Sequence, residues 1–310
     1  MAERPSSEVI RLYDAFTHGA VERREFLDRL ARLAGSTAAA AALLPVLGND
    51  YARAGVVAED DKRLTTRMVT FDTGAIVDLP PPEEISPGVT RPFTHIPRVS
   101  AYCAYQDTMV RPAVIVIHEN RGLNPHIKDV ARRLALEGFV AFAVDMLSPI
   151  GGTPTDEDRA RLLIGKLDRA KTAQKLAAIA EHLAMVKTHG RHVGAVGFCW
   201  GGGMVNALAA AGGDFLEAGV VYYGRQGAPE EAARIKAAML YHYAARDERI
   251  NQGVAPWEAA LSAAKVRFQS YMYENADHAF NNDTNAARYD KAAADLAWGR
   301  SVAFLREHFA

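Results

Sequence analysis

The amino-acid sequence predicts an α/β fold: a doubly wound, mostly parallel sheet with helices on both faces, preceded by an N-terminal helical extension. Two observations support this prediction. Short, nearly continuous apolar segments recur between residues 112 and 273, and segments with helical periodicity lie between them. Strands that are apolar on both faces belong in parallel sheets that helices cover. The alternation of strand and helix patterns therefore favours a doubly wound sheet.

The predicted strands are six apolar segments: 112–118, 139–145, 192–198, 218–224, 238–244 and 266–273. Residues 126–139 have apolar side chains at helical spacing, and Gly138 is a suitable helix stop. Residues 155–186 are predicted as one further helix, in which Thr155 precedes Asp158 in a capping-box-like start. Its predicted buried face consists of Leu162, Leu163, Leu167, Leu176, Ile179 and Leu183.

Composition limits the classes of partner. The formal net charge is −1 and no long basic segment is present, so we expect a small-molecule substrate rather than nucleic acid. No uninterrupted apolar stretch reaches the roughly 18 residues of an ordinary membrane span. The two cysteines, Cys103 and Cys199, are too few for a disulfide scaffold and have no CxxC spacing. Cys103 is expected to be a small buried hydrophobic residue.

We expect residues 1–60 to form an N-terminal extension and residues 61–310 to form the main domain, which the proline-rich segment 79–97 leads into. Within residues 22–55, Arg23-Arg24 precede an Ala/Leu-rich region and Ala52-Arg53-Ala54 stand before Gly55. This order resembles a twin-arginine export signal, which would make the protein periplasmic. The alternative is a retained amphipathic helix in a cytoplasmic protein, with an apolar face formed by Phe26, Leu27, Leu30, Leu33 and Ala34.

A cysteine stands among glycines directly after the predicted strand 192–198. The residues Gly197-Phe198-Cys199-Trp200-Gly201 form the pattern G-x-C-x-G, a nucleophile elbow with Cys in place of Ser. The sharp turn requires residues without Cβ on both sides of the nucleophile, and the following Gly202 and Gly203 let the helix pack closely on the sheet. The helix N-terminus favours thiolate. A purely structural tight turn would explain the glycines but not the cysteine.

Two further loops offer a base and its orienting acid. Asp247 follows strand 238–244 and His278 follows strand 266–273, so both belong to the carboxyl ends of predicted strands. The order nucleophile, acid, histidine is that of the α/β architecture with a nucleophile elbow. Asp277 is a competing acid, but the side chain adjacent to His278 in the chain points elsewhere. No other histidine combines these features. His118-Glu119 begins like a metal-binding H-E-x-x-H motif, but residue 122 is glycine, so no metal is implied.

Glu119 lies at the end of the predicted strand 112–118. One interpretation is a solvated loop carboxylate. The other is a carboxylate beside the elbow that shares a buried proton with the thiol.

With these residues in view, the chain resembles the dienelactone hydrolase (carboxymethylenebutenolidase) family of α/β hydrolases over residues 65–310. The resemblance rests on H-E-x-x-G-L-N at 118–124, the elbow, the Asp247 loop and D-H-A-F at 277–280. It implies that Cys199 is the nucleophile, His278 the base and Asp247 its orienter. Glu119 would hold the resting thiol, and the backbone N–H groups of Asn120 and Trp200 would form the oxyanion hole. The implied reaction is acyl transfer to Cys199 and hydrolysis of the thioester, without a cofactor.

The sequence departs from this family at the substrate site. Members that take dienelactone carry an arginine four residues after the catalytic histidine, where this chain has Asn282. Arg121 is either a replacement or a surface arginine, and Tyr223 and Arg225 are candidates for the pocket wall. A broad carboxylesterase and a dedicated dienelactone hydrolase both fit. The extension would either cover the pocket or build an interface in a homo-oligomer.

The alternative function is a non-catalytic α/β-hydrolase-like protein with a redox or ligand-binding thiol. The complete Asp247–His278 pair argues against it.

Overall fold

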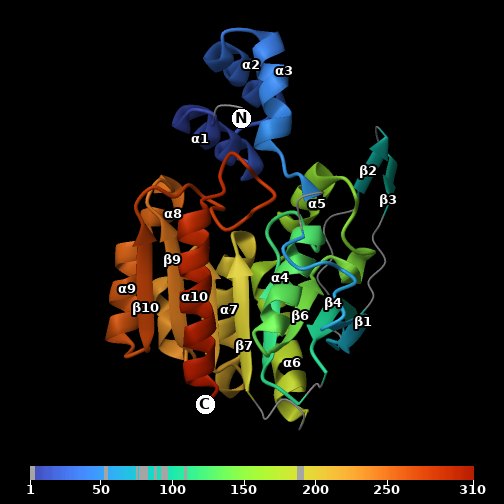
Figure 1. The fold of residues 1–310 in the computed structure, drawn as a ribbon, viewed down its shortest axis with the longest axis vertical. Coiled ribbons are helices and arrows are strands. Elements are labelled where there is room, and N and C mark those ends of the chain that lie inside the picture. Colours follow the sequence, from blue (N-terminus) through green and yellow to red (C-terminus); the bar gives the residue numbers. More distant parts are fainter. Residues whose placement is uncertain are drawn as a thin grey trace.

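The structure is a computed structural model that describes residues 4–51, 55–74, 76, 83–86, 89–91, 97–107, 110–186 and 192–310. It consists of an α/β body with a group of three helices at one end of the sheet (Figure 1). The candidate cleavage site Ala52-Arg53-Ala54 lies outside the described residues, as does much of segment 79–97. Within that segment, β2 (Glu83–Ser86) and β3 (Val89–Arg91) form a separate antiparallel pair.

The body is built on an eight-stranded sheet in the order β1-β4-β6-β5-β7-β8-β9-β10. The two strands at one edge, β1 (Thr65–Asp72) and β4 (Arg98–Tyr105), pair antiparallel, and β4 also pairs antiparallel with β6. The other pairs are parallel, so the predicted mostly parallel sheet is confirmed. All six predicted strands are present: β5 (Ala113–Ile117), β6 (Val140–Asp145), β7 (Val193–Phe198), β8 (Ala218–Tyr222), β9 (Ala238–Ala244) and β10 (Phe268–Tyr273).

Helices cover both faces of this sheet. As a consequence, five of its central strands are buried along their whole length. One face packs against α4 (Pro125–Leu136) and α10 (Lys291–His308). The other face packs against α6 (Arg169–Met185), α7 (Trp200–Ala211) and α9 (Val254–Ala263). The short α8 (Glu248–Asn251) and three 3₁₀ turns, at 148–150, 213–215 and 229–234, lie in the connections. Cys103 is fully buried in β4, as expected.

The predicted helix 155–186 is wrong as a single element, because the chain forms two helices there. α5 (Glu157–Ile164) is capped by Asp156, and α6 is capped by Asp168, each carboxylate accepting a backbone N–H of the first turn. The second cap restarts the helix after a short connection. Thr155 is therefore not the cap, and Leu162 is 56% exposed rather than part of the buried face.

The N-terminal extension contains α1 (Ser7–Thr17), α2 (Arg23–Ala34) and α3 (Thr37–Leu47). These helices form a small core of their own, in which the rings of Phe16 and Phe26 stack 4.6 Å apart and Leu30 is fully buried. Leu27 and Leu33, expected on the apolar face, are exposed.

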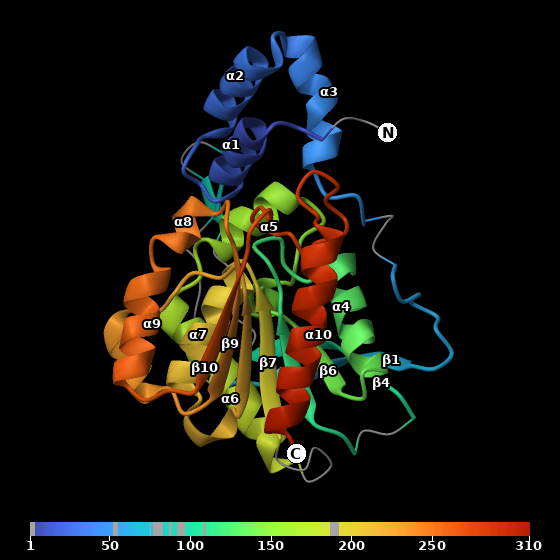
Figure 2. The ribbon, with the colours of Figure 1, turned by 60° about the vertical axis from the view of Figure 1, so that its left-hand side comes forward.

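Figures 1 and 2 show the extension above the carboxyl ends of the strands, with α1 and α3 nearest the body. Arg4 donates to the carboxylate of Asp277 at 2.7 Å, and Arg23 pairs with Asp158 at 2.5 Å. The amide of Asn285 donates to the carbonyl of Leu47. These contacts attach the extension to α5 and to the segment between β10 and α10.

Within the described part of the chain, no single helix has the length and apolarity to cross a membrane. α2 and α3 meet that criterion only when they are taken together, and they are bent by 110° at their junction.

Candidate active site

The nucleophile elbow has the geometry that its glycines predict. Cys199 adopts φ 54° and ψ −114°, a left-handed conformation that is rare for a residue with a side chain. A Cβ on Gly197 would lie 2.2 Å from the carbonyl oxygen of Gly201, and a Cβ on Gly201 would lie 2.3 Å from the carbonyl oxygen of Ile117. The elbow therefore requires glycine at both positions.

The two glycines after the elbow differ. A Cβ on Gly202 would lie 2.9 Å from Cα of Gly224, so this glycine allows α7 to pack closely on the neighbouring strand connection. A Cβ on Gly203 would have no neighbour closer than 3.4 Å. Close packing therefore depends on Gly202, whereas Gly203 is less constrained than the sequence suggested.

His278 and Asp247 meet beside the elbow. Oδ2 of Asp247 lies 2.5 Å from Nδ1 of His278, and both residues are about 4% exposed. Asp277, the competing acid, instead pairs with Arg4. Nε2 of His278 is buried without a hydrogen-bond partner among the described residues, and a ring nitrogen of His278 lies within 4.8 Å of Sγ of Cys199.

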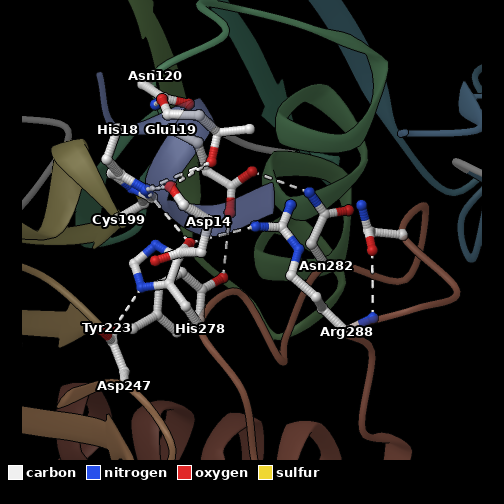
Figure 3. A network of polar contacts seen from close by, with 12 residues as sticks. Asp14, His18, Glu119, Asn120, Cys199, Tyr223, Asp247, His278, Asn282 and Arg288 are labelled. Atoms are coloured by element: carbon white, nitrogen blue, oxygen red, sulfur yellow. Dashed lines mark hydrogen bonds and ion pairs between the residues drawn. The ribbon is translucent and has the colours of Figure 1, made fainter. Parts of the chain in front are cut away.

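A second histidine, which the sequence analysis missed, already contacts the thiol. Nε2 of His18 lies 3.3 Å from Sγ of Cys199 (Figure 3). Nδ1 of His18 lies 2.8 Å from the carbonyl oxygen of Asp14 and 3.2 Å from its carboxylate. The rings of His18 and His278 meet edge to face, with centroids 4.8 Å apart. The thiol therefore lies between two imidazoles, each with a carboxylate at Nδ1.

The charges at this site shift its proton equilibria. Burial alone would raise the pKa of the Cys199 thiol, but the neighbouring His278 and His18 lower it to about 6. Burial alone would lower the pKa of His18, but the thiolate and Asp14 raise it to about 8. Burial opposes the charged form of His278 as well, yet Asp14, Asp247 and Cys199 raise its pKa well above the usual value. The site therefore favours a thiolate paired with imidazolium at neutral pH.

Glu119 is buried at the site, but its hydrogen bonds go to residues other than the thiol. It is 5% exposed, so it is not a solvated loop carboxylate. One carboxylate oxygen accepts from Nδ2 of Asn282 at 2.9 Å, and the other accepts from the hydroxyl of Tyr223 at 3.3 Å. In this structure His18, not Glu119, contacts the sulfur.

With this geometry established, comparison with known proteins identifies the family. A family model described as "Dienelactone hydrolase family" matches residues 99–309, more than half of the chain. The chain belongs to the dienelactone hydrolase family. A second model, described as "YqhI-like", matches residues 6–36 and thus covers α1 and α2.

Relatives and solved structures agree with this assignment. A "Putative carboxymethylenebutenolidase" of Escherichia coli strain K12 is 32% identical over 211 residues, which cover 64% of this chain and 77% of the relative. One of the same description from Saccharolobus solfataricus is 32% identical over 232 residues, covering 63% and 88%. A "Putative Dienelactone Hydrolase" structure from Klebsiella pneumoniae has a TM-score of 0.62 at 26% identity and covers 78% of this chain and 99% of its own. A dienelactone hydrolase-like promiscuous phosphotriesterase, P91, from metagenomic libraries has a TM-score of 0.65 at 25% identity, covering 80% and 100%.

In this dienelactone hydrolase family member, the predicted substrate residues separate into two groups. A cavity of about 650 Å³ opens at Cys199, and its wall includes Asn120, Trp200, Tyr223 and Arg225. Arg121 instead donates to the carbonyl of Glu157 at 3.3 Å and is 6% exposed. Asn282 is fully buried and holds Glu119. The structure thus places Arg121 and Asn282 behind the cavity wall rather than on it.

The cavity wall is cationic. Its residues include Arg161, Lys166, Arg225 and Arg249, and none of the residues lining it, all within the described chain, is acidic. The extension contributes Thr17, His18 and Gly19 to the same wall. The extension therefore forms part of the pocket wall.

Three side chains with polar ligand atoms converge at the site. The ring nitrogens of His18 and His278 and Sγ of Cys199 lie within 4.8 Å of one another. Nε2 of His18 is hydrogen-bonded to Sγ at 3.3 Å. Thiols bind adventitious metal ions readily, so assays of Cys199 include a chelator.

Proposed function

We propose that this protein is a cysteine-dependent hydrolase of small carboxylic esters or lactones and works through a thioester acyl-enzyme. The observation that carries the proposal is the placement of Cys199 at a strained elbow, within reach of an imidazole that Asp247 orients. A buried thiol with no chemical role would not need a left-handed backbone conformation or a pKa lowered by two imidazoles.

The proposed reaction begins with the thiol proton on Nε2 of His278. The thiolate attacks the carbonyl carbon, an S–C bond forms, and the carbonyl π electrons move to oxygen. The C–O bond to the leaving group then breaks, and His278 gives its proton to the departing oxygen. Water attacks the thioester, His278 takes a proton from that water, and the C–S bond breaks to release the acid and restore the pair. Asp247 keeps Nδ1 protonated so that Nε2 faces the reacting atoms.

The oxyanion that forms in both steps needs donors close to the sulfur. Trp200 is the first residue of α7, so its N–H belongs to the first turn, which has no intrahelical acceptor. Asn120 follows β5 and lies in the cavity wall. We propose the backbone N–H groups of these two residues as the oxyanion hole, each worth about 2.7–4 kcal/mol in the transition state.

The test is turnover of p-nitrophenyl acetate and of a lactone, with the Cys199→Ala variant and a matched Cys103→Ala control, in the presence of EDTA. We expect Cys199→Ala to reduce turnover to background and Cys103→Ala to retain it. Mass spectrometry of quenched enzyme should show an acyl group on Cys199 alone. Equal, background-level rates in the wild type and Cys199→Ala would contradict the proposal and favour a redox or ligand-binding thiol.

We further propose that the substrate carries a carboxylate, because the cavity wall holds four cations and no acid. Arg225 is exposed on that wall and is the simplest partner for such a group. Arg225→Ala should raise KM for carboxylated lactones and leave KM for neutral lactones unchanged. Arg234→Ala, a control on the 3₁₀ turn at 229–234, should change neither. Equal effects on both lactones would contradict carboxylate recognition by Arg225.

A further inference from the structure

We infer that His18, which the N-terminal extension supplies, is a second catalytic histidine acting on Cys199, and that with Asp14 it holds the nucleophile as a thiolate in the resting enzyme. The inference rests on the proposed function, because it concerns the same nucleophile. It assigns a catalytic role to a segment outside the hydrolase body and outside the part of the chain that the dienelactone hydrolase model matches.

The first argument is the orientation of the imidazole. Nδ1 of His18 lies 2.8 Å from the backbone carbonyl of Asp14, and a carbonyl oxygen only accepts hydrogen bonds. Nδ1 therefore carries a proton, and Nε2 is the atom that faces the sulfur at 3.3 Å. With both nitrogens protonated, Nε2–H donates to the thiolate. The carboxylate of Asp14 lies 3.2 Å from Nδ1, on the opposite side of the ring.

The second argument comes from the two helix ends that meet at this contact. His18 is the C-cap of α1, where the partial negative charge of the helix end stabilises a cation. Cys199 is the N-cap of α7, where the partial positive charge stabilises an anion. An imidazolium at the first position and a thiolate at the second fit both helix dipoles. The opposite assignment of charge would fit neither.

The third argument concerns Glu119, which the sequence analysis expected to hold the resting thiol and which has other partners in the structure. Both carboxylate oxygens of Glu119 are occupied, one by Asn282 and one by Tyr223. Asn282 is fully buried, and its amide oxygen accepts from the hydroxyl of Thr284 at 2.6 Å. The carboxylate of Glu119 is thus engaged in a satisfied network, and no hydrogen bond joins it to Sγ, both residues being described in the structure. The hydrogen bond to Sγ comes from His18.

The extension is anchored where the contact requires it. The carbonyl of Thr17, next to His18, accepts from Nδ2 of Asn120 at 2.9 Å. Arg4 donates to the carbonyl of Ala287 at 3.0 Å and to Asp277, the neighbour of His278. Both ends of α1 are therefore joined to loops of the active site, and His18 is placed by these bonds rather than by the Sγ contact alone.

The charged and titratable groups around His18 come from several elements. They are Asp14 on α1, Cys199 at the elbow, His278 and Asp247 in the loops after β10 and β9, Arg249 on α8, Arg288 before α10, and Glu119 and Tyr223 just after β5 and β8. Arg249 and Arg288 each lie 3.6 Å from the carboxylate of Asp14. Burial alone would raise the pKa of Asp14, but His278, His18 and Arg288 together lower it. The pKa of His18 is raised to about 8 and that of Cys199 is lowered to about 6, so the ion pair persists between these values.

The contact has a defined place in the reaction. The thiolate loses its charge when the S–C bond forms. His18 therefore stabilises the enzyme before acylation and after deacylation more than it stabilises the acyl-enzyme. No proton needs to leave His18 during the cycle, because His278 performs the proton transfers. The consequence is a nucleophile that remains ionised at mildly acidic pH.

The inference is tested by titrating the thiolate absorbance of the full chain, in EDTA. The signal below about pH 9 comes from Cys199, because burial raises the pKa of Cys103 to about 12. We expect His18→Gln to raise the Cys199 midpoint by about one pH unit or more. His192→Gln is the matched control, since His192 forms a 2.8 Å pair with Glu217 and precedes β7, while Cys199 follows it. An unchanged midpoint in His18→Gln, with the extension still protected from proteolysis, would overturn the inference.

A second measurement does not depend on the folding of that variant. NMR of labelled histidine in the full chain reports the titration of His18 directly. Removal of the thiolate in Cys199→Ser should lower the His18 midpoint by about one unit, because an opposite charge is lost. An identical His18 titration in the wild type and Cys199→Ser would refute the ion pair.

These outcomes separate the two proposals. If Cys199→Ala kept full turnover, the hydrolase proposal would fail. If Cys199→Ala were inactive while both titrations stayed unchanged, only the role of His18 would fail.

Mass spectrometry of the mature protein is a further test. A cleaved export signal would leave a chain that starts at Gly55. Such a chain lacks His18 and would contradict the inference. We expect residues 14 and 18 to be present.

Discussion

Two imidazole–carboxylate pairs lie on either side of Cys199, and they are alike in chemistry but not in origin. In the pair His278–Asp247, the two residues come from loops after β10 and β9, 31 positions apart in the chain. In the pair His18–Asp14, they are four residues apart at the end of one helix. The first pair is built into the carboxyl edge of the sheet. The second pair is brought to that edge by a docked segment.

Because the two pairs differ in origin, they also differ in how firmly the fold holds them in place. β9 and β10 pair through six residues, from Phe268↔Met239 to Tyr273↔Ala244, so the loops of the first pair stay in register while the sheet is intact. The second pair depends instead on the docking of three helices, which contact the body through side chains and not through strand pairing. His18 is also more open to solvent, with a side chain 15% exposed against 4% for His278. We therefore expect the first pair to be indispensable and the second to tune the site.

The largest effect should distinguish the two histidines in turnover. His278→Ala removes the proton carrier of both half-reactions, and we expect kcat/KM to fall by about 100- to 10 000-fold. His18→Ala leaves that carrier in place, and we expect a loss of about tenfold or less at neutral pH. Steady-state kinetics on the same ester measures both, with His192→Ala as the control. Equal losses in the two variants would show that the pairs are equivalent and would contradict the comparison.

The next effect concerns the docked helices themselves. Phe26 is 2% exposed and stacks on Phe16, so Phe26→Ala should cost the extension about 3–5 kcal/mol of stability. Loss of this core should also release His18 and raise the midpoint of the Cys199 titration. Leu27→Ala, at an exposed neighbouring position, is the control and should change stability by about 0.5 kcal/mol or less. Chemical denaturation and thiolate titration are the measurements. If Phe26→Ala destabilised the extension but left the Cys199 midpoint unchanged, docking of the extension would not control the ionisation of the thiol.

A smaller contrast is expected between the two acids. Asp247→Asn removes the charge that orients the catalytic imidazole, and kcat/KM should fall about 100-fold or more. Asp14→Asn should lower it about tenfold or less, and the loss should diminish at alkaline pH, where the thiol ionises without help. Asp295→Asn is a control at an exposed position. If the loss in Asp14→Asn were independent of pH, Asp14 would act on structure rather than on ionisation.

The smallest effect is on stability against pH. His18 has a raised pKa, so its contribution is complete below the ordinary value of 6.5 and is lost as the pH rises through about 8. Cys199 has a lowered pKa, so its contribution is complete above the ordinary value of 9 and is lost as the pH falls through about 6. Between these limits the wild type should be more stable than His18→Gln by about 1 kcal/mol. Thermal unfolding across this range measures the difference, and a difference that grew above pH 8 would contradict the sign.

Much of the body could be predicted because its strands are apolar along their whole length. The segments that became β5 to β10 stand out in the sequence, and a carboxyl edge common to them brings Cys199, Asp247 and His278 together. β1 and β4 were not predicted because they lie at the antiparallel edge. Most of β1 is at least partly exposed, so it has no continuous apolar pattern. The break between α5 and α6 was missed because the capping role of Asp168 outweighs a leucine spacing that continues through it.

The site was less predictable where it depends on docking. The sequence suggests Glu119 as the partner of the thiol, since both follow neighbouring strands. Whether Glu119 faces the sulfur or Asn282 depends on side-chain packing. His18 gave only a weak signal, an acid and a histidine four residues apart near the start of the chain. Nothing in strand periodicity relates that segment to the sheet. Its contact with Cys199 follows from tertiary packing alone.

The anchoring of Arg4 beside the catalytic loop has a practical consequence for handling the protein. A fusion joined ahead of residue 1 would lie only a few positions along the chain from Arg4, which donates to Asp277, the neighbour of His278. The C-terminus lies at the opposite end of the sheet from the extension (Figures 1 and 2). An affinity tag there lies far from the first helix, whereas an amino-terminal tag would adjoin the segment that carries the Arg4–Asp277 contact.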